Sequence, residues 1–579
     1  MIRPLLNLQR QLKIEKFSDV FPNLNLKDTK FSQVKARIIS RSKDALSLLK
    51  CIVASDMRYF SKKIIPLNLP EKFGFILHFD FTRLDDDIEE EEIRAISSKK
   101  IKEIINELPN SRVTFIDFSL LEFRGDEIGQ LQVAMKKSAI KEIVIGRSLL
   151  KSRGFKQFIE SLSSMDTLKS VTFTDGNIPC GKYQFNDPCF KQLERVVFWN
   201  LKSHCKNTEL LDILKLSRRI KNVEMCNINC NINISSFLCL DRLSVLSLTG
   251  IKTMLPFELV DCIRTLPVTT LDLSDNNFDS EWLIYLSKAL KECKVTTMSI
   301  GLNRRYCNTT QINNGLYCLF NRLHKSRIRD FTVSIYDIDE RAFKLLGKRL
   351  YFLQSLSVAT KEIRKTSFVA LSKALRFKKN YLTTLSVQAR SFQAGSLNQI
   401  INIFKSRNKI FLKSLSFDCM EGMPSQDIKP FFFNLGGLQL EELCVSGLQQ
   451  QSFYDKFQIK PSLKHAFASL SLPISLKQID FSGNRLCDED IESLFTLIER
   501  LHVLDLSKNL LTDATAIRFS QILPSCMLRA LDLECNQIHD LGATHLFDSM
   551  KTSNLSHLNL QGNFIFNEKL IAKVKFYSF

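Results

Sequence analysis

The sequence predicts an α/β solenoid built from repeated strand–helix segments. Three observations predict it. A nine-residue pattern recurs at nearly constant spacing, apolar and polar residues alternate within it, and apolar residues at helical spacing follow it. A chain with a regular period of about 20–50 residues stacks its repeats into one array, because each repeat buries its apolar face only against its neighbours.

The recurring pattern is LxxLxLxxN. It is clear at residues 268–276 and in four consecutive copies at residues 476–563, which follow one another at steps of 25, 27 and 27 residues. With this frame, degenerate copies can be placed from Val113 onward, which gives 17 repeats with an average step of about 28 residues. A further copy is suggested at Ile76.

Each pattern predicts a short strand followed by a turn. Apolar residues at positions 1, 4 and 6 alternate with outward residues at positions 3 and 5, as in a strand with one buried face. The asparagine at position 9 is expected to satisfy backbone groups where the strand ends. We therefore assign it a structural role and no binding role.

A helix is expected after each turn. In residues 278–290, Leu283, Leu286 and Leu290 recur three and four positions apart, which is typical of an amphipathic helix. The same spacing holds for Ile491, Leu494, Phe495 and Ile498.

These residues resemble the ribonuclease-inhibitor-like leucine-rich-repeat family, which includes repeat parts of innate-immune receptors and the Ran GTPase-activating proteins. The resemblance covers roughly residues 76–579. It implies an α/β leucine-rich-repeat solenoid, or horseshoe, with a parallel sheet on the concave face and helices on the convex face.

The beginning of the chain lacks the repeat. Residues 1–72 are expected to form an N-terminal helical cap or a small domain, with residues 30–57 as a helix, and residues 73–579 form the solenoid of about 17–18 repeats. Two repeats, at 295–327 and 440–475, are over-long, and their extra residues are expected to form loops.

Composition favours a reducing compartment. The 16 cysteines are irregularly spaced in a long chain and are expected to be free thiols, many of them buried. No apolar stretch reaches the ~20 residues that a bilayer requires, and residues 1–10 lack the features of a cleaved signal. We expect a cytoplasmic monomer, or one delivered into the cytosol of a host cell.

No catalytic motif is present. The sequence has no glycine-rich phosphate loop, no GxSxG and no HExxH, and its eight histidines are scattered. We expect no enzyme activity, no cofactor and no metal.

Binding is expected on the outward strand residues. In the repeat at Leu193, Arg195, Val197 and Trp199 are predicted to point outward, with Trp199 as the strongest candidate anchor. Aspartates recur at position 5, and the last three should line up in adjacent repeats. Two interpretations of them remain open, an acidic strip for a basic partner and an ordinary polar strand residue. The candidate partner-binding residues are Arg195, Trp199, Asp272, Asp480, Asp505, Asp532 and His557.

The partner is expected to be a protein. The formal net charge of +20 would also suit nucleic acid, but paired basic residues such as Arg218–Arg219 lie in helix and loop segments rather than on strands. The divergent repeats and the abundance of Lys, Ile, Asn and Phe resemble leucine-rich-repeat effectors that intracellular bacteria inject into host cells. The alternatives are a regulator of a small GTPase resembling the Ran GTPase-activating proteins, or a solenoid that binds nucleic acid.

Overall fold

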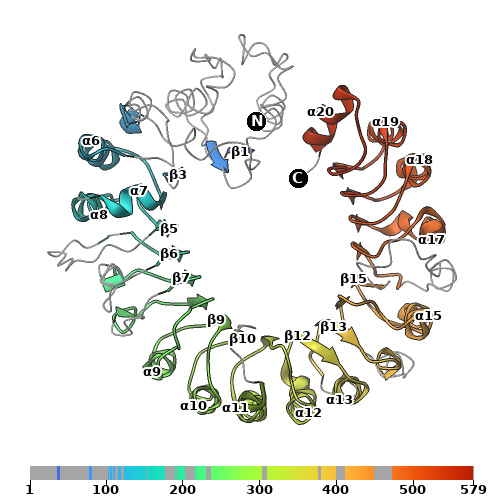
Figure 1. Ribbon diagram of the computed structural model, residues 1–579, viewed down its shortest axis with the longest axis horizontal. Coiled ribbons are helices and arrows are strands. Elements are labelled where there is room, and N and C mark those ends of the chain that lie inside the picture. Colours follow the sequence, from blue (N-terminus) through green and yellow to red (C-terminus); the bar gives the residue numbers. More distant parts are fainter. Residues whose placement is uncertain are drawn as a thin grey trace. The chain divides into compact units, whose positions relative to one another are not determined.

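The computed structural model divides the chain into two compact units, an N-terminal unit of Met1–Asn277 and a C-terminal unit of Phe278–Phe579. Figure 1 labels their helices and strands. It describes residues 123–577 apart from 153, 177–189, 191, 203–213, 216, 230–235, 303–308, 376–379, 400–410 and 449–472. Before residue 123 it describes 35–38, 77–80, 102, 105–106, 108–110 and 115–118.

The N-terminal unit contains one parallel sheet whose strands pair in chain order. The strands are β3 (Phe115–Asp117), β4 (Glu142–Ile145), β5 (Ser170–Thr174), β6 (Arg195–Trp199), β7 (Asn222–Cys226), β8 (Val245–Thr249) and β9 (Thr270–Asn276). η4 (Leu108–Asn110) precedes β3, and between the strands lie α6 (Gly125–Lys136), α7 (Arg147–Lys151), α8 (Phe155–Ser163) and α9 (Glu258–Thr265).

The C-terminal unit repeats the arrangement with longer helices. Its strands are β10 (Thr297–Leu302), β11 (Asp330–Ser334), β12 (Ser355–Ile363), β13 (Thr384–Phe392), β14 (Ser414–Cys419), β15 (Glu442–Ser446), β16 (Gln478–Asp480), β17 (Val503–Asp505), β18 (Ala530–Asp532) and β19 (His557–Asn559). Its α-helices are α10 (Ser280–Ala289), α11 (Thr309–Arg322), α12 (Glu340–Arg349), α13 (Lys365–Leu375), α15 (Ser425–Phe433), α17 (Asp488–Ile491), α18 (Asp513–Ile522), α19 (Asp540–Ser549) and α20 (Glu568–Tyr577).

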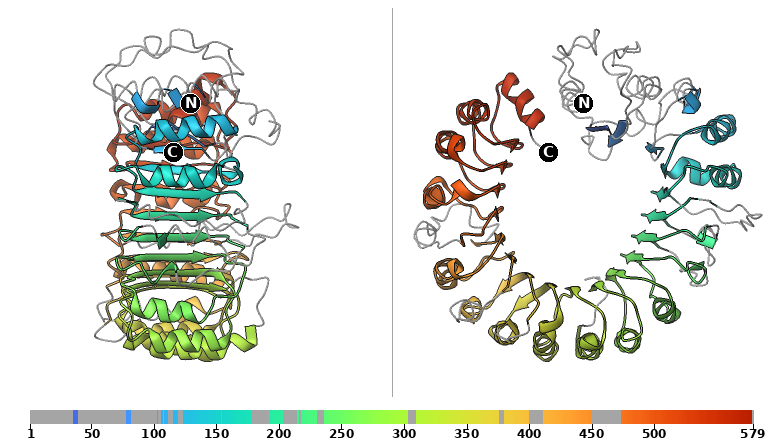
Figure 2. Two further views of the ribbon diagram at one scale, coloured as in Figure 1. Left: turned by 90° about the vertical axis from the view of Figure 1, so that its left-hand side faces the viewer. Right: turned by 180° about the vertical axis from the view of Figure 1, so that it is seen from behind.

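Short 3-10 helices complete several of these repeats. They are η7 (Leu323–Lys325), η8 (Leu350–Phe352), η9 (Leu435–Gly437), η10 (Glu492–Leu494), η11 (Ile498–Arg500) and η12 (Leu523–Ser525). Within each unit the strands lie side by side and the helices lie on the opposite side of the repeat (Figure 2). This is the α/β leucine-rich-repeat solenoid that the repeat pattern predicts, and each predicted strand from Val113 onward is present.

The inward positions of the pattern form the core. In β9, Leu271 and Leu273 are fully buried, whereas Thr270 and Asp272 between and beside them are half-buried. The helix predicted in residues 278–290 is α10, and its Leu283 and Leu286 are buried against the sheet side. The alternation and the helical spacing thus place the buried residues correctly.

The asparagines at position 9 have the predicted structural role. Asn509 is buried, accepts the backbone N–H groups of Asn484 and Leu486, and donates to the carbonyl groups of Phe481 and Leu506. It therefore links the turn of its own repeat to that of the preceding repeat. Asn276, Asn484, Asn536 and Asn563 make corresponding contacts.

The N-terminal segment contains a correction. Residues 35–38, predicted within a helix, form strand β1 (Lys35–Ile38), which pairs antiparallel with β2 (Leu77–Asp80). The pairing supplies backbone hydrogen bonds between segments some forty residues apart, and local apolar spacing contains no information about such a partner. The remainder of the predicted helix and the loops of the two over-long repeats, at 303–308 and 449–472, lie outside the described residues.

Candidate functional site

The outward strand positions of each unit form one continuous surface. Positions 3, 5 and 7 of neighbouring strands lie in register, so side chains from successive repeats stand in rows across the sheet. We call the outward positions of β4–β9 the N-terminal strand face and those of β10–β19 the C-terminal strand face.

Arg195 lies on the N-terminal strand face, as predicted, but it is already paired. Its Nε and Nη2 atoms donate to the two carboxylate oxygens of Glu224 on the next strand, at 2.9 and 3.1 Å. The hydrogen bond to Glu224 also raises the pKa of the Arg195 guanidinium. Arg195 therefore offers a fixed planar group and not a free positive charge.

Val197, the next outward residue of β6, is only 5% exposed. It is flanked in register by Thr172 and Glu224, and along the strand by Arg195 and Trp199. Val197 thus occupies the predicted outward position of β6 but is buried there. A small apolar residue between larger neighbours loses its access to solvent even at an outward position.

Trp199 lies on the N-terminal strand face with its side chain 52% exposed. It ends β6, in register with Thr174 and Cys226, and precedes Asn200, whose backbone is left-handed with φ of 50°. This agrees with the predicted outward orientation. A large aromatic side chain exposed on a strand face is a candidate anchor for a partner.

Beside Trp199, a ladder of polar side chains holds the turns of three repeats together. The Asn200 side-chain amide donates to Asp175 at 2.7 Å, and the Asn227 amide donates to Asn200 at 2.9 Å. All three residues have positive φ angles, which Asn and Asp tolerate better than most residues. The ladder fixes the backbone from which Trp199 projects.

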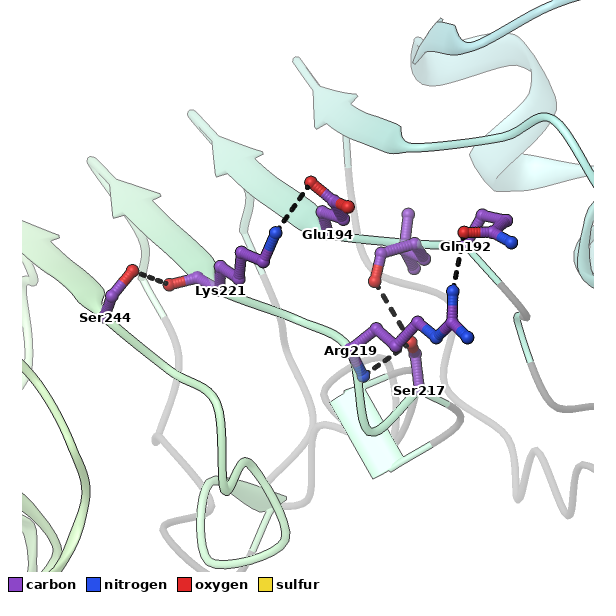
Figure 3. Close-up of polar contacts among 7 residues, drawn as sticks. Gln192, Glu194, Ser217, Arg219, Lys221 and Ser244 are labelled. Carbon is purple, nitrogen blue, oxygen red and sulfur yellow. Dashed lines mark hydrogen bonds and ion pairs between the residues drawn. The ribbon is translucent and has the colours of Figure 1, made fainter.

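At the other end of the same strands, a second set of contacts joins neighbouring repeats (Figure 3). Lys221 Nζ lies 3.3 Å from Glu194 Oε2, and the Ser244 hydroxyl donates to the Lys221 carbonyl oxygen at 3.1 Å. Arg219 donates to the Gln192 side chain at 2.7 Å. Both ends of β6 and β7 are thus held by polar contacts between repeats.

The aspartates at position 5 share one local contact. Asp272, Asp480, Asp505 and Asp532 each accept a backbone N–H from the residue two positions later, at 2.8 to 3.0 Å. This contact stabilises the end of the strand and is a structural reason for an oxygen acceptor at position 5.

Three of these aspartates lie side by side. Asp480 is in register with Asp505, and Asp505 with Asp532, on β16, β17 and β18. We call them the acidic row. Asp272 belongs to the N-terminal strand face. Burial raises the pKa of Asp505, and the carboxylates of Asp480 and Asp532 raise it further, whereas hydrogen bonds from Ser507 lower it.

Polar groups bound the acidic row at both ends. The Cys444 thiol, on β15, contacts Asp480 Oδ2 at 3.3 Å, and burial followed by the Asp480 charge raises the pKa of this thiol to about 12. The Asn559 amide, on β19, donates to both oxygens of Asp532 and to Glu534. His557 is half-buried at position 3 of β19, with Nδ1 2.7 Å from the Ser556 hydroxyl.

Sequence reasoning missed Glu224, Glu534 and Asn559, which contact the predicted residues. Glu224 and Asn559 lie at position 5 of the repeat after that of their partners, and Glu534 lies at position 7 of the repeat of Asp532. Applying the frame to these copies would have placed all three among the outward residues. The hydroxyl residues Ser355, Ser357, Thr384, Ser386, Ser414 and Ser416 lie outward as predicted.

Metal sites and membrane-spanning helices are both absent from the described residues. Among the described residues, no group of three or more His, Cys, Asp or Glu side chains is placed to hold a metal ion. Within the same ranges, no helix combines the length and apolar character needed to cross a bilayer.

Comparison with known proteins agrees with the repeat fold. A family described as Leucine Rich repeat matches residues 525–547, and no curated protein matches the chain. Among solved structures, a complex of TLR13 with single-stranded RNA has 16% identity and a TM-score of 0.46, and covers 79% of this chain and 57% of that one.

Two bacterial structures are also similar. An internalin from Listeria monocytogenes has 17% identity and a TM-score of 0.29, covering 63% of this chain and 80% of its own. A leucine-rich-repeat protein from Leptospira interrogans has 14% identity and a TM-score of 0.31, covering 82% and 95% respectively.

Proposed function

For a leucine-rich-repeat chain with these strand faces, we propose a non-catalytic function, the binding of a protein partner. The observation that carries the proposal is the exposed Trp199 on the N-terminal strand face. Polar ladders at both ends of its strand hold the surrounding backbone in place, so binding there would lose little conformational entropy.

A protein is favoured over nucleic acid by the charge of the strand faces. Asp272, Glu142 and Glu224 lie outward on the N-terminal face, where Arg195 is neutralised by Glu224. The phosphate backbone of a nucleic acid would be repelled by such a surface. Binding that survives removal of nucleic acid by nuclease treatment would agree with this proposal.

The ribonuclease-inhibitor-like subtype is part of the proposal. It is supported by the average repeat of about 28 residues and by helices of 10 to 14 residues such as α10, α11 and α18. A role as an effector that acts on host proteins in the cytosol is supported by the divergent repeats and by composition. No specific contact favours regulation of a small GTPase.

The test is affinity capture with the full chain immobilised, compared with Trp199→Ala and a matched control, Phe433→Ala. Phe433 is 64% exposed at the end of α15, away from the strand positions. We expect the wild type and the control to capture the same partner proteins, and Trp199→Ala to capture at least about tenfold less of them. Equal capture by all three chains would contradict the placement of the site.

A further inference from the structure

The C-terminal strand face has a charge opposite to that of the whole chain. Positions 3, 5 and 7 of β10–β19 contain seven acidic residues and no lysine or arginine, although the chain has 81 lysines and arginines against 61 acidic residues. The seven are Asp330, Asp418, Glu442, Asp480, Asp505, Asp532 and Glu534. Basic residues flank these positions, with Arg329, Lys413, Lys477 and Arg529 at position 2, Lys508 at position 8, and Lys361 and Arg390 at position 9.

In the described part of the chain, lysines and arginines do not neutralise these charges. Among the described residues, none of the seven forms an ion pair with a lysine or arginine. The N-terminal strand face differs, because there Glu224 is paired with Arg195. Charge on the C-terminal face is therefore available to a partner.

The fold does not require the negative charge of the acidic row. Asn559 occupies position 5 of β19 and accepts the backbone N–H of Gln561 at 3.2 Å with an uncharged amide oxygen. Serines occupy the same row on β12, β13 and β14. Three adjacent carboxylates repel one another, so their presence in a row costs stability that an amide would not cost.

The surroundings of the row leave room for long side chains. On one side lie Val503 and Ala530 at position 3, and on the other lie Ser482 and Ser507 at position 7. The aliphatic part of an incoming lysine or arginine can lie on the small apolar residues while its charged end reaches the carboxylates.

The spacing of the row indicates the form of the occupant. Neighbouring strands lie roughly 4.8 Å apart. Side chains one turn apart on an α-helix are separated by about 5.4 Å. Same-face side chains of an extended peptide are about 6.7 Å apart, which exceeds the spacing of the strands, so they could not meet successive carboxylates of the row.

We propose that the C-terminal strand face docks an α-helical segment of a partner protein that presents lysine or arginine along one face. The basic residues, three and four positions apart, pair with Asp480, Asp505 and Asp532 in turn. This inference rests on the proposed protein-binding function and names the chemistry of the partner.

The test uses the full chain and two synthetic helical peptides of roughly 20 residues with the same composition. One places its lysines on a single helical face, and the other distributes them around the helix. We expect the single-face peptide to bind the wild type about tenfold more tightly, and its binding to weaken as salt rises from roughly 50 to 500 mM. Equal affinity for the two peptides, or no binding of either, would overturn the inference.

A triple variant locates the binding. Asp480→Asn, Asp505→Asn and Asp532→Asn together keep the acceptor for the backbone N–H, as Asn559 does, and remove the charge. The control removes three charges from helices instead, through Glu281→Gln, Glu489→Gln and Glu568→Gln on α10, α17 and α20.

We expect the triple variant to bind the single-face peptide about tenfold more weakly and the control to bind like the wild type. Thermal unfolding checks that both variants are folded. If both bind the peptide like the wild type, the docking site is not the acidic row. The proposed function is judged separately by Trp199→Ala, which does not touch this face.

Discussion

Repeats of the C-terminal unit end their strands in two different ways. In β16–β19 the strands are three residues long, and an asparagine at position 9 follows each of them. Asn484, Asn509 and Asn536 are buried, and Asn563 is half-buried. In β12 and β13 the strands are nine residues long and no asparagine occurs at that position, where Lys361 and Arg390 stand instead. We call these the asparagine repeats and the long-strand repeats.

Both arrangements satisfy the same backbone groups. In the asparagine repeats, the chain turns at position 8, with left-handed backbone at Gly483, Lys508, Cys535 and Gly562, and the asparagine side chain bonds the exposed backbone groups. In the long-strand repeats, the backbone stays extended and pairs with its neighbour as far as Ile363 and Phe392. Buried backbone groups need partners, and either a side chain or a longer ladder can supply them.

Because of this difference, substitution at position 9 should destabilise the two kinds of repeat to different extents. One buried side chain makes several bonds in an asparagine repeat, so one substitution removes them together. In a long-strand repeat the bonds are shared among many backbone groups, and the side chain at position 9 is exposed.

Gly447→Ala is expected to be the most destabilising single change, at about 3 kcal/mol or more. Gly447 follows β15 with φ of 71°, and an added Cβ would overlap the carbonyl oxygen of Cys419 in the preceding repeat. Gly483 in an asparagine repeat has φ of 67° but no atom within 4 Å of an added Cβ. Gly483→Ala should therefore cost only about 1 kcal/mol in urea unfolding. Similar costs would show that backbone strain alone, and not the close approach of repeats, governs position 8.

Asn509→Ala is expected to cost about 2–3 kcal/mol, because it removes the acceptor of two buried backbone N–H groups and one donor to each of the Phe481 and Leu506 carbonyls. Lys361→Ala, at the same position of a long-strand repeat, should change the free energy of unfolding by less than about 0.5 kcal/mol. Chemical denaturation of the two variants measures the contrast. A comparable loss in Lys361→Ala would contradict the view that the ladder replaces the asparagine.

Asp505→Asn is expected to stabilise the protein at neutral pH, by roughly 0.5 kcal/mol on the scale of like-charged neighbours on adjacent strands. Burial and the two neighbouring carboxylates raise the pKa of Asp505 in the folded state above its ordinary value of 3.8. The free energy of unfolding of the wild type therefore falls as the pH rises from 3.8 through the raised pKa. Below pH 3.8 the carboxyl is protonated in both states and the advantage of the variant disappears.

Asp126→Asn is expected to change the stability at neutral pH in the opposite direction. A hydrogen bond from Lys102 lowers the pKa of Asp126, so this substitution should destabilise at neutral pH, and its effect should also vanish in acid. Thermal unfolding of both variants from pH 3 to pH 7 tests the pair. If Asp505→Asn destabilises at neutral pH, the acidic row does not carry the proposed repulsive cost.

Much of this molecule could be predicted from sequence because its structure is local. The frame placed every strand from β3 to β19, the inward and outward residues, the structural asparagines and the exposed Trp199. Each depends on an alternation of period two or on a spacing that recurs every repeat, and both are visible along the chain. The alignment of Asp480, Asp505 and Asp532 also followed from their shared position 5 in consecutive copies of the pattern.

The features that could not be predicted from the sequence depend on contacts between neighbouring segments of the folded chain. The neutralisation of Arg195 by Glu224, the burial of Val197 and the pairing of β1 with β2 each require a partner from another segment. The same holds for the long strands β12 and β13, which extend only because each is the other's partner. The sequence by itself determined which side chains face outward, since that is set by the local backbone. Which of them remain free to meet a partner was decided by the adjacent repeats, since charge pairing and solvent access are properties of the assembled surface.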